Sequence, residues 1–105
     1  MQNSKALAFI SGLLLTATLA AAADLSGRVT FRGAPLAGAV VTANLVGKQG
    51  PASVTITRTD PQGGYALRGL TNGEYILLVD MDGRRVFQGR IVLTDSTLVK
   101  NIELQ

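Results

Sequence analysis

Residue types that usually carry out chemistry are scarce in this sequence, which contains no histidine and no cysteine. A serine nucleophile normally needs a histidine base, a thiol nucleophile needs cysteine, and the common zinc sites are built largely from these two residue types. We therefore predict no catalytic, metal-binding or cofactor-binding residues, and no cofactor.

Asp80 and Asp82, followed by Gly83, resemble a fragment of a calcium-binding loop. Calcium takes about six to eight oxygen ligands, which is more than this fragment supplies. An Asp-Gly pair between two apolar runs is also a strong signal for a tight β-hairpin, because both residues tolerate a positive φ. We predict a hairpin at this position and no metal site.

The first 23 residues have the order of a secretory signal peptide. Lys5 lies in a short polar segment, an uncharged apolar segment follows, and a run of alanines precedes Asp24. We predict a helical signal peptide over residues 1–23, a mature chain that begins near Asp24, and export to the periplasm or the extracellular space. A retained N-terminal membrane anchor is the alternative, since the uncharged stretch approaches the roughly 20 residues that a span needs.

After residue 23 the apolar residues recur with the period of β-strands. Leu25, Val29 and Phe31 alternate with polar residues, as in a half-buried strand. Turn signals separate such segments, and none has a helical period. We expect strands near residues 25–32, 39–46, 53–59, 65–67, 74–81, 84–93 and 98–104. The pattern predicts one all-β domain over residues 24–105, a seven-stranded antiparallel Greek-key β-sandwich.

The alternation also predicts which side chains fill the core between the two sheets. The inward set consists of apolar residues at alternate positions: Val29, Phe31, Val41, Leu45, Val54, Ile56, Tyr65, Leu67, Leu70, Tyr75, Leu77, Val79, Ile91, Ile102 and Leu104. Without cysteine there are no disulfides, so burial of these side chains must stabilise the domain.

Four sequence blocks resemble the carboxypeptidase regulatory-like domain. They span residues 27–29, 33–41, 59–65 and 69–75. The resemblance implies a transthyretin-like (prealbumin-like) β-sandwich, grouped under a carbohydrate-binding-like fold, with turn-forming motif residues Asp60, Gly63, Gly64 and Gly73. Hydroxyisourate hydrolases and intradiol dioxygenases use related sandwiches, but both rely on histidines, which this chain lacks.

The resemblance implies an accessory, scaffold or interaction role. We therefore expect a non-enzymatic structural or protein-interaction module of the cell envelope or extracellular space, with a carbohydrate-binding module as the alternative. Sugar sites usually stack rings on exposed aromatic residues, and of Phe31, Tyr65, Tyr75 and Phe87 we expect only Phe87 outside the core. This expectation favours a protein partner over a glycan.

An apolar face is expected on the strand over residues 74–81, where Ile76 and Leu78 point away from the core. Val86 and Val92 on the following strand would extend this face, and contiguous apolar patches often mark interaction surfaces. The expected partner is another protein or a second copy of the chain. Without Lys5, nine basic and seven acidic residues remain, so nucleic acid is not an expected partner, nor is stable membrane insertion after processing.

Overall fold

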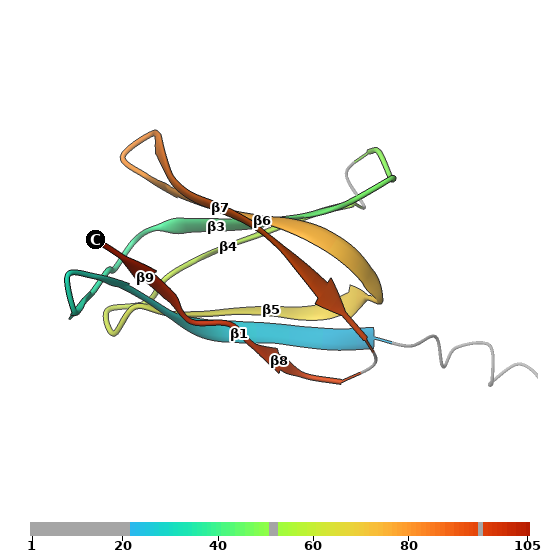
Figure 1. Cartoon of the computed structure of the whole chain (residues 1–105), viewed down its shortest axis with the longest axis horizontal. Coiled ribbons are helices and arrows are strands. Elements are labelled where there is room, and N and C mark those ends of the chain that lie inside the picture. Colours follow the sequence, from blue (N-terminus) through green and yellow to red (C-terminus); the bar gives the residue numbers. More distant parts are fainter. Residues whose placement is uncertain (1–21, 51–52, 95) are drawn as a thin grey trace, which may run out of the picture.

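Two β-sheets packed face to face make up the described part of the chain (Figure 1). The computed structural model describes residues 22–50, 53–94 and 96–105. Within these ranges no helix has the length and hydropathy to cross a membrane. The predicted signal-peptide helix, residues 1–23, lies outside the described residues except for Ala22 and Ala23, and these two residues lie in a strand rather than a helix. The strands are β1 (Ala22–Phe31), β2 (Ala34–Pro35), β3 (Val40–Leu45), β4 (Val54–Arg58), β5 (Gly64–Thr71), β6 (Gly73–Met81), β7 (Arg84–Leu93), β8 (Leu98–Val99) and β9 (Ile102–Leu104).

The chain alternates between the sheets. One sheet has the order β2-β1-β5, with β8 and β9 also paired to β1, and the other has the order β4-β3-β6-β7. Pairing is antiparallel except that β8 and β9 run parallel to β1. The fold is therefore the predicted all-β sandwich. The seven strands expected are nine, because β2 is an additional short strand and the expected final strand is divided into β8 and β9. These last two strands pair in parallel, and not antiparallel as predicted, because β7 ends beside Gly73, at the end of the sandwich where β1 begins.

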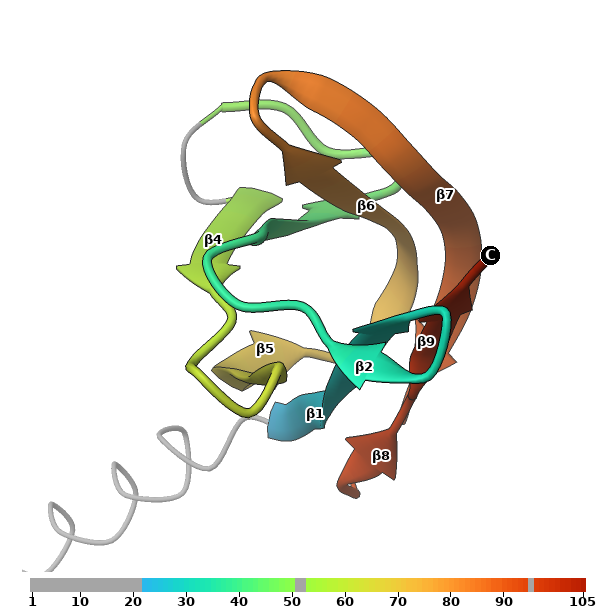
Figure 2. The ribbon, with the colours of Figure 1, turned by 90° about the vertical axis from the view of Figure 1, so that its left-hand side faces the viewer.

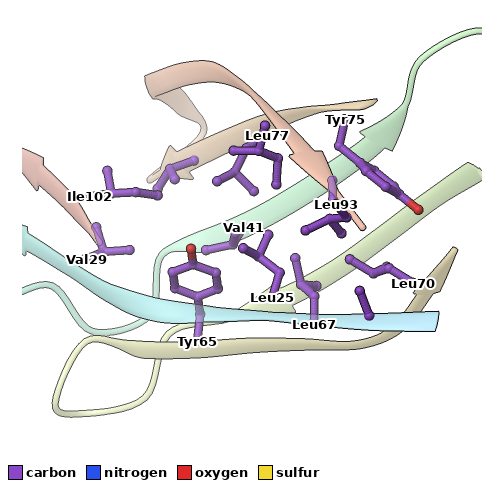
Figure 3. Close-up of a cluster of buried hydrophobic side chains, with 14 of the residues drawn as sticks. Leu25, Val29, Val41, Tyr65, Leu67, Leu70, Tyr75, Leu77, Leu93 and Ile102 are labelled. Carbon is purple, nitrogen blue, oxygen red and sulfur yellow. The ribbon is translucent and has the colours of Figure 1, made fainter. Parts of the chain in front are cut away.

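The inner faces of both sheets supply the core (Figure 3). Leu25 from β1, Val41 from β3 and Leu77 from β6 are fully buried, and all three point into the space between the sheets. The prediction is correct for most of the inward set. Leu45 and Leu104 are only partly buried against the core, and the core also contains Ala23, Leu25, Ala39, Ala43 and Leu93, which the predicted set omitted.

The predicted orientation of β4 is wrong. Its apolar residues Val54 and Ile56 are 40% and 61% exposed. Residues directly opposite in neighbouring strands share a face, and buried Val41 lies opposite Thr57. The threonines of β4 therefore face inward and its apolar residues face outward. This is tolerated because β4 is an edge strand that contributes little to the core.

Phe31 is the other core residue that was placed wrongly, since it is 42% exposed. It ends β1, beside the turn formed by Arg32 and Gly33. At this end of the sandwich Phe31 lines an open groove with Met81 and Val86 of the facing sheet, so its ring stays partly exposed. The predicted hairpin after β6 is confirmed, because Asp82 and Gly83 both have positive φ, at 53° and 78°.

Candidate functional site

Asp60 organises the turn that leads into β5. Its Oδ1 atom accepts hydrogen bonds from the backbone amides of Gln62 (2.9 Å) and Gly64 (2.8 Å), and its backbone carbonyl accepts one from Gly63 (2.8 Å). The carbonyl of Gly63 in turn accepts a hydrogen bond from the amide of Val29 at 2.8 Å. The carboxylate is thus engaged with its own turn, and the turn is joined to β1.

The motif glycines have steric roles at the two ends of β5. Gly63 has φ +80°, and a Cβ atom there would lie 2.5 Å from the carbonyl oxygen of Val29. A Cβ atom on Gly64 would lie 3.1 Å from the Asp60 carboxylate, and one on Gly73 would lie 2.9 Å from Leu45 Cδ1. These contacts explain the four motif residues as turn-forming residues, and they do not assemble into one ligand site.

The outer face of the β4-β3-β6-β7 sheet carries the predicted interaction residues Ile76 and Leu78. Both are partly buried, while their neighbours Tyr75, Leu77 and Val79 are buried in the core. The alternation predicted for β6 is therefore observed in the structure.

Strand register places further apolar residues on this outer face. Leu78 lies opposite Thr42 on β3, and Thr42 lies opposite Ile56 on β4. In the adjacent row Asn44 separates Ile76 from Val54. We use the name outer-face patch for the apolar residues that surround Thr42: Val40, Val54, Ile56, Ile76 and Leu78.

Of the two valines expected to extend this patch, Val92 lies on the outer face and Val86 does not. Val92 is 64% exposed and lies opposite Glu74, diagonal to Ile76 and beside the ion pair between Glu74 and Arg90. Val86 lines a separate groove with Phe31 and other residues. The structure thus places Ile76, Leu78 and Val92 on one face and Val86 elsewhere. The patch extends toward β4 because β4 has the opposite orientation to the one predicted.

Charged residues border the outer-face patch. On β7, Arg90 lies opposite Ile76, and it pairs with Glu74. Asp80 accepts a hydrogen bond from Arg85 Nε at 2.6 Å. An apolar centre with a polar and charged rim is the usual anatomy of a protein interface.

The two tyrosines have structural roles. The hydroxyl of Tyr65 donates to the carbonyl of Lys100 at 2.6 Å, and burial raises the pKa of Tyr65 to about 12. The hydroxyl of Tyr75 donates to the carbonyl of Thr71 at 2.8 Å. Among the described residues the exposed aromatic is Phe31, whereas Phe87 packs partly against the core, so the expected roles of these two are reversed.

Within the described ranges there is no group of three or more histidine, cysteine or acidic residues that could hold a metal ion. Asp80 is paired with Arg85, and Asp82 belongs to the hairpin described above.

Comparison with solved structures shows the same fold at low sequence identity. The dioxygenase domain of a dioxygenase–carbohydrate-binding fusion from Streptomyces sp. SirexAA-E matches with a TM-score of 0.66 and 16% identity, over 85% of this chain and 82% of that one. A proposed carbohydrate-binding protein from Pseudomonas aeruginosa matches with a TM-score of 0.57 and 10% identity, over 80% of this chain and 89% of that one. The 5-hydroxyisourate hydrolase of Klebsiella pneumoniae matches with a TM-score of 0.55 and 22% identity, over 78% of this chain and 91% of that one.

Sequence comparisons give a family. No match is found among curated proteins. The family model of the carboxypeptidase regulatory-like domain matches residues 24–105, the range over which the motif turns and the sandwich were described above. The chain therefore belongs to the carboxypeptidase regulatory-like domain family.

Proposed function

We propose that this domain is a non-enzymatic structural or protein-interaction module of the cell envelope or extracellular space, and that it binds its partner protein through the outer-face patch. The exposure of Ile56 on this patch is the observation that carries the proposal. Ile56 is 61% exposed, whereas the buried core residues are at most 8% exposed. On β4 this apolar side chain therefore faces solvent while the polar threonines face the core.

An exposed apolar edge strand is a liability, because such strands promote aggregation. Proteins usually place lysine or another charged residue on the outward positions of an edge. On β4 two of the three outward residues are instead apolar, namely Val54 and Ile56, and Arg58 is the third. A partner that covers the patch would account for this composition.

Two further observations support a role without catalysis. The sequence contains neither histidine nor cysteine. The carboxylate of Asp60, a turn-forming residue of the family motif, accepts hydrogen bonds from the amides of its own turn. Export rests on the N-terminal segment, whose order of charged, apolar and small residues is that of a signal peptide.

Carbohydrate binding is the alternative, and it has less support. A sugar ring would need a free aromatic face, and Phe31 is the exposed aromatic among the described residues. The guanidinium of Arg32 already lies over this ring, 5.1 Å from its centroid.

Charge substitution at exposed positions tests the proposal without disturbing the core. Ile56→Lys should abolish co-purification of the partner from the envelope fraction of the cells that make this protein, or abolish self-association in sedimentation. Val99→Lys is the matched control, because Val99 is 63% exposed and lies on β8 in the other sheet. Loss of association in both variants or in neither would contradict the proposal.

A further inference from the structure

Strand β4 has a free edge along one side of the sandwich (Figure 2). It is the last strand of the β4-β3-β6-β7 sheet, and within the described residues it pairs with β3 alone. The side of β4 away from β3 therefore presents backbone amide and carbonyl groups that have no partner strand there, as edge strands do.

A hydrogen bond at the end of β4 shows which backbone groups lie on this edge. Successive residues of an antiparallel strand direct their amide and carbonyl groups to opposite sides. The amide of Thr59 donates to the carbonyl of Ala39 at 2.9 Å, so the backbone of Thr59 is directed toward β3. In steps of two, Thr57 and Thr55 are directed toward β3 as well. The backbone groups on the free edge are those of the remaining residues of β4: Val54, Ile56 and Arg58.

A second hydrogen bond, on the other side of β3, gives the same assignment. The amide of Val46 donates to the carbonyl of Glu74 beside β6, at 2.8 Å. Even-numbered residues of β3 are therefore directed toward β6 and odd-numbered ones toward β4. Val41, an odd-numbered residue, lies opposite Thr57, as the assignment requires.

The two edges of this sheet differ in their protection against pairing with another strand. At the other edge, β7 contains Arg85 and Arg90 and has a β-bulge at Val86. Val86 is the extra residue, because Arg85 and Phe87 on either side of it lie opposite consecutive residues of β6. Charged residues and bulges both hinder edge pairing. The charged residue of β4 is Arg58 at its end, and no bulge interrupts the register of β4 with β3, so β4 is the edge that is open to pairing.

The sequence of β4 is nearly palindromic, which makes the strand complementary to a second copy of itself. It reads Val-Thr-Ile-Thr-Arg, with Ile56 at the centre. Antiparallel pairing about Ile56 sets this residue opposite its own copy and Thr55 opposite Thr57 of the other copy, and such pairs of β-branched residues stabilise sheets. Arg58 then lies opposite Val54, so the two arginines are kept apart.

We propose that β4 pairs antiparallel with β4 of a second copy of the chain, about a two-fold axis at Ile56. The two sheets form one continuous sheet, every backbone group on the two free edges gains a partner, and the two Ile56 side chains pack together. A contact of this symmetry closes after two copies, so it covers the edge without forming fibres. The inference rests on the proposed interaction role and names the partner as a second copy.

Introduced cysteines can report the register of this pairing, because the chain contains no cysteine of its own. Residues opposite each other on antiparallel strands are close enough for a disulfide. A mixture of the Val54→Cys and Arg58→Cys proteins should therefore form a disulfide-linked dimer under mild oxidation, and each variant alone should form far less. Gln88→Cys, at an exposed position on β7 of the same sheet, is the control and should form no dimer with either. No dimer in the mixture, or equal yields in the mixture, the single variants and the control, would overturn the proposal.

Sedimentation equilibrium of the mature protein gives a second readout. The wild type should dimerise reversibly. Ile56→Pro removes the central amide of the free edge and leaves the hydrogen bonds to β3, and proline is tolerated at such edge positions. The dissociation constant of the dimer should rise at least about tenfold, because both central hydrogen bonds are lost. Leu78→Gln, on the outer-face patch but on β6 away from the edge, should leave the dissociation constant unchanged. An unchanged dissociation constant in Ile56→Pro would refute the pairing.

These measurements also separate this inference from the proposed function. A wild type that is monomeric, yet captures an envelope protein through Ile56, would refute the β4 pairing and leave the proposed function in place. A dimer that is lost in Leu78→Gln and kept in Ile56→Pro would indicate contact through the face of the sheet, with the same consequence. A wild type that forms neither a dimer nor another complex would contradict both.

Discussion

Single residues of this domain mostly serve the fold, and the residues with the most specific contacts lie where β1 meets the C-terminal strands. The carbonyl of Lys100 accepts the Tyr65 hydroxyl, and Asn101 Oδ1 accepts the backbone amide of Arg28 at 3.0 Å. These contacts bridge the interruption between β8 and β9. They could not be predicted from the sequence, because they depend on the parallel return of the chain to β1.

The phenol of Tyr65 should make stability sensitive to alkaline pH. Burial raises its folded pKa to about 12, above the ordinary value of 10.0, so the neutral form stabilises the fold. This contribution is complete below about pH 10 and is lost as the pH rises toward 12. The free energy of unfolding should fall more steeply over this window in the wild type than in Tyr65→Phe. Parallel curves for the two proteins would contradict the role of this hydroxyl.

Gly27 should be intolerant of a side chain. A Cβ atom at this position would lie 2.0 Å from the carbonyl oxygen of Lys100, a backbone atom that cannot move without displacing the C-terminal strands. Gly27→Ala should lower the free energy of unfolding by about 1–3 kcal/mol or more, as overpacking does. Ser26→Ala, whose side chain lies on the other face of β1, is the control. Equal chemical denaturation midpoints for Gly27→Ala and the wild type would show that β8 is not held against β1.

Among the elements, the β6–β7 hairpin could be predicted from the sequence, whereas the orientation of the edge strand β4 could not. In β6 and β7 the apolar pattern and the Asp-Gly turn both indicate the observed hairpin, and the bounds predicted for β7, 84–93, are those observed. In β4 the alternation led to the wrong prediction that Val54 and Ile56 face the core. Alternation separates the side chains into two faces without showing which face is buried. The bulge at Val86 likewise leaves no periodic signal.

The free energy of unfolding of alanine variants tests which face of β4 is directed toward the core. Leu77 is fully buried on β6, so Leu77→Ala should cost about 2–5 kcal/mol. Ile56→Ala should cost much less, within about 1 kcal/mol, because most of its side chain is already exposed to solvent. Thermal and urea unfolding of the two variants decides between the faces. A decrease in the free energy of unfolding for Ile56→Ala as large as that for Leu77→Ala would show that the apolar side chains of β4 face the core.

At the scale of the whole molecule, the fold class and the family could be predicted from residues 24–105. This range contains seven short apolar segments with the period of strands and four sequence blocks that resemble the family. The candidate surfaces could be predicted only in part. Ile76 and Leu78 follow from the alternation of one strand, whereas the groove lined by Phe31 and Val86 combines residues from β1, β6, β7 and β9 with the segment after β2. Such a combination depends on the three-dimensional packing of the sheets.

Cleavage of the N-terminal segment remains a prediction. The alanines before Asp24 should direct cleavage at or within a few residues of that position. N-terminal mass spectrometry of the exported protein should give a mature chain that begins there. A membrane-bound form that retains Met1 would instead support the N-terminal anchor.

The most direct test of the proposed contact is site-specific photocrosslinking in the cells that make this protein. A benzoylphenylalanine placed at Ile56 should give a discrete crosslinked product with a partner protein or a second copy of the chain, because this position lies on the outer-face patch. The same probe at Val99, equally exposed on the other sheet, should give none. A product from Val99 and none from Ile56, or no product from either position, would contradict an interaction module that acts through the outer-face patch.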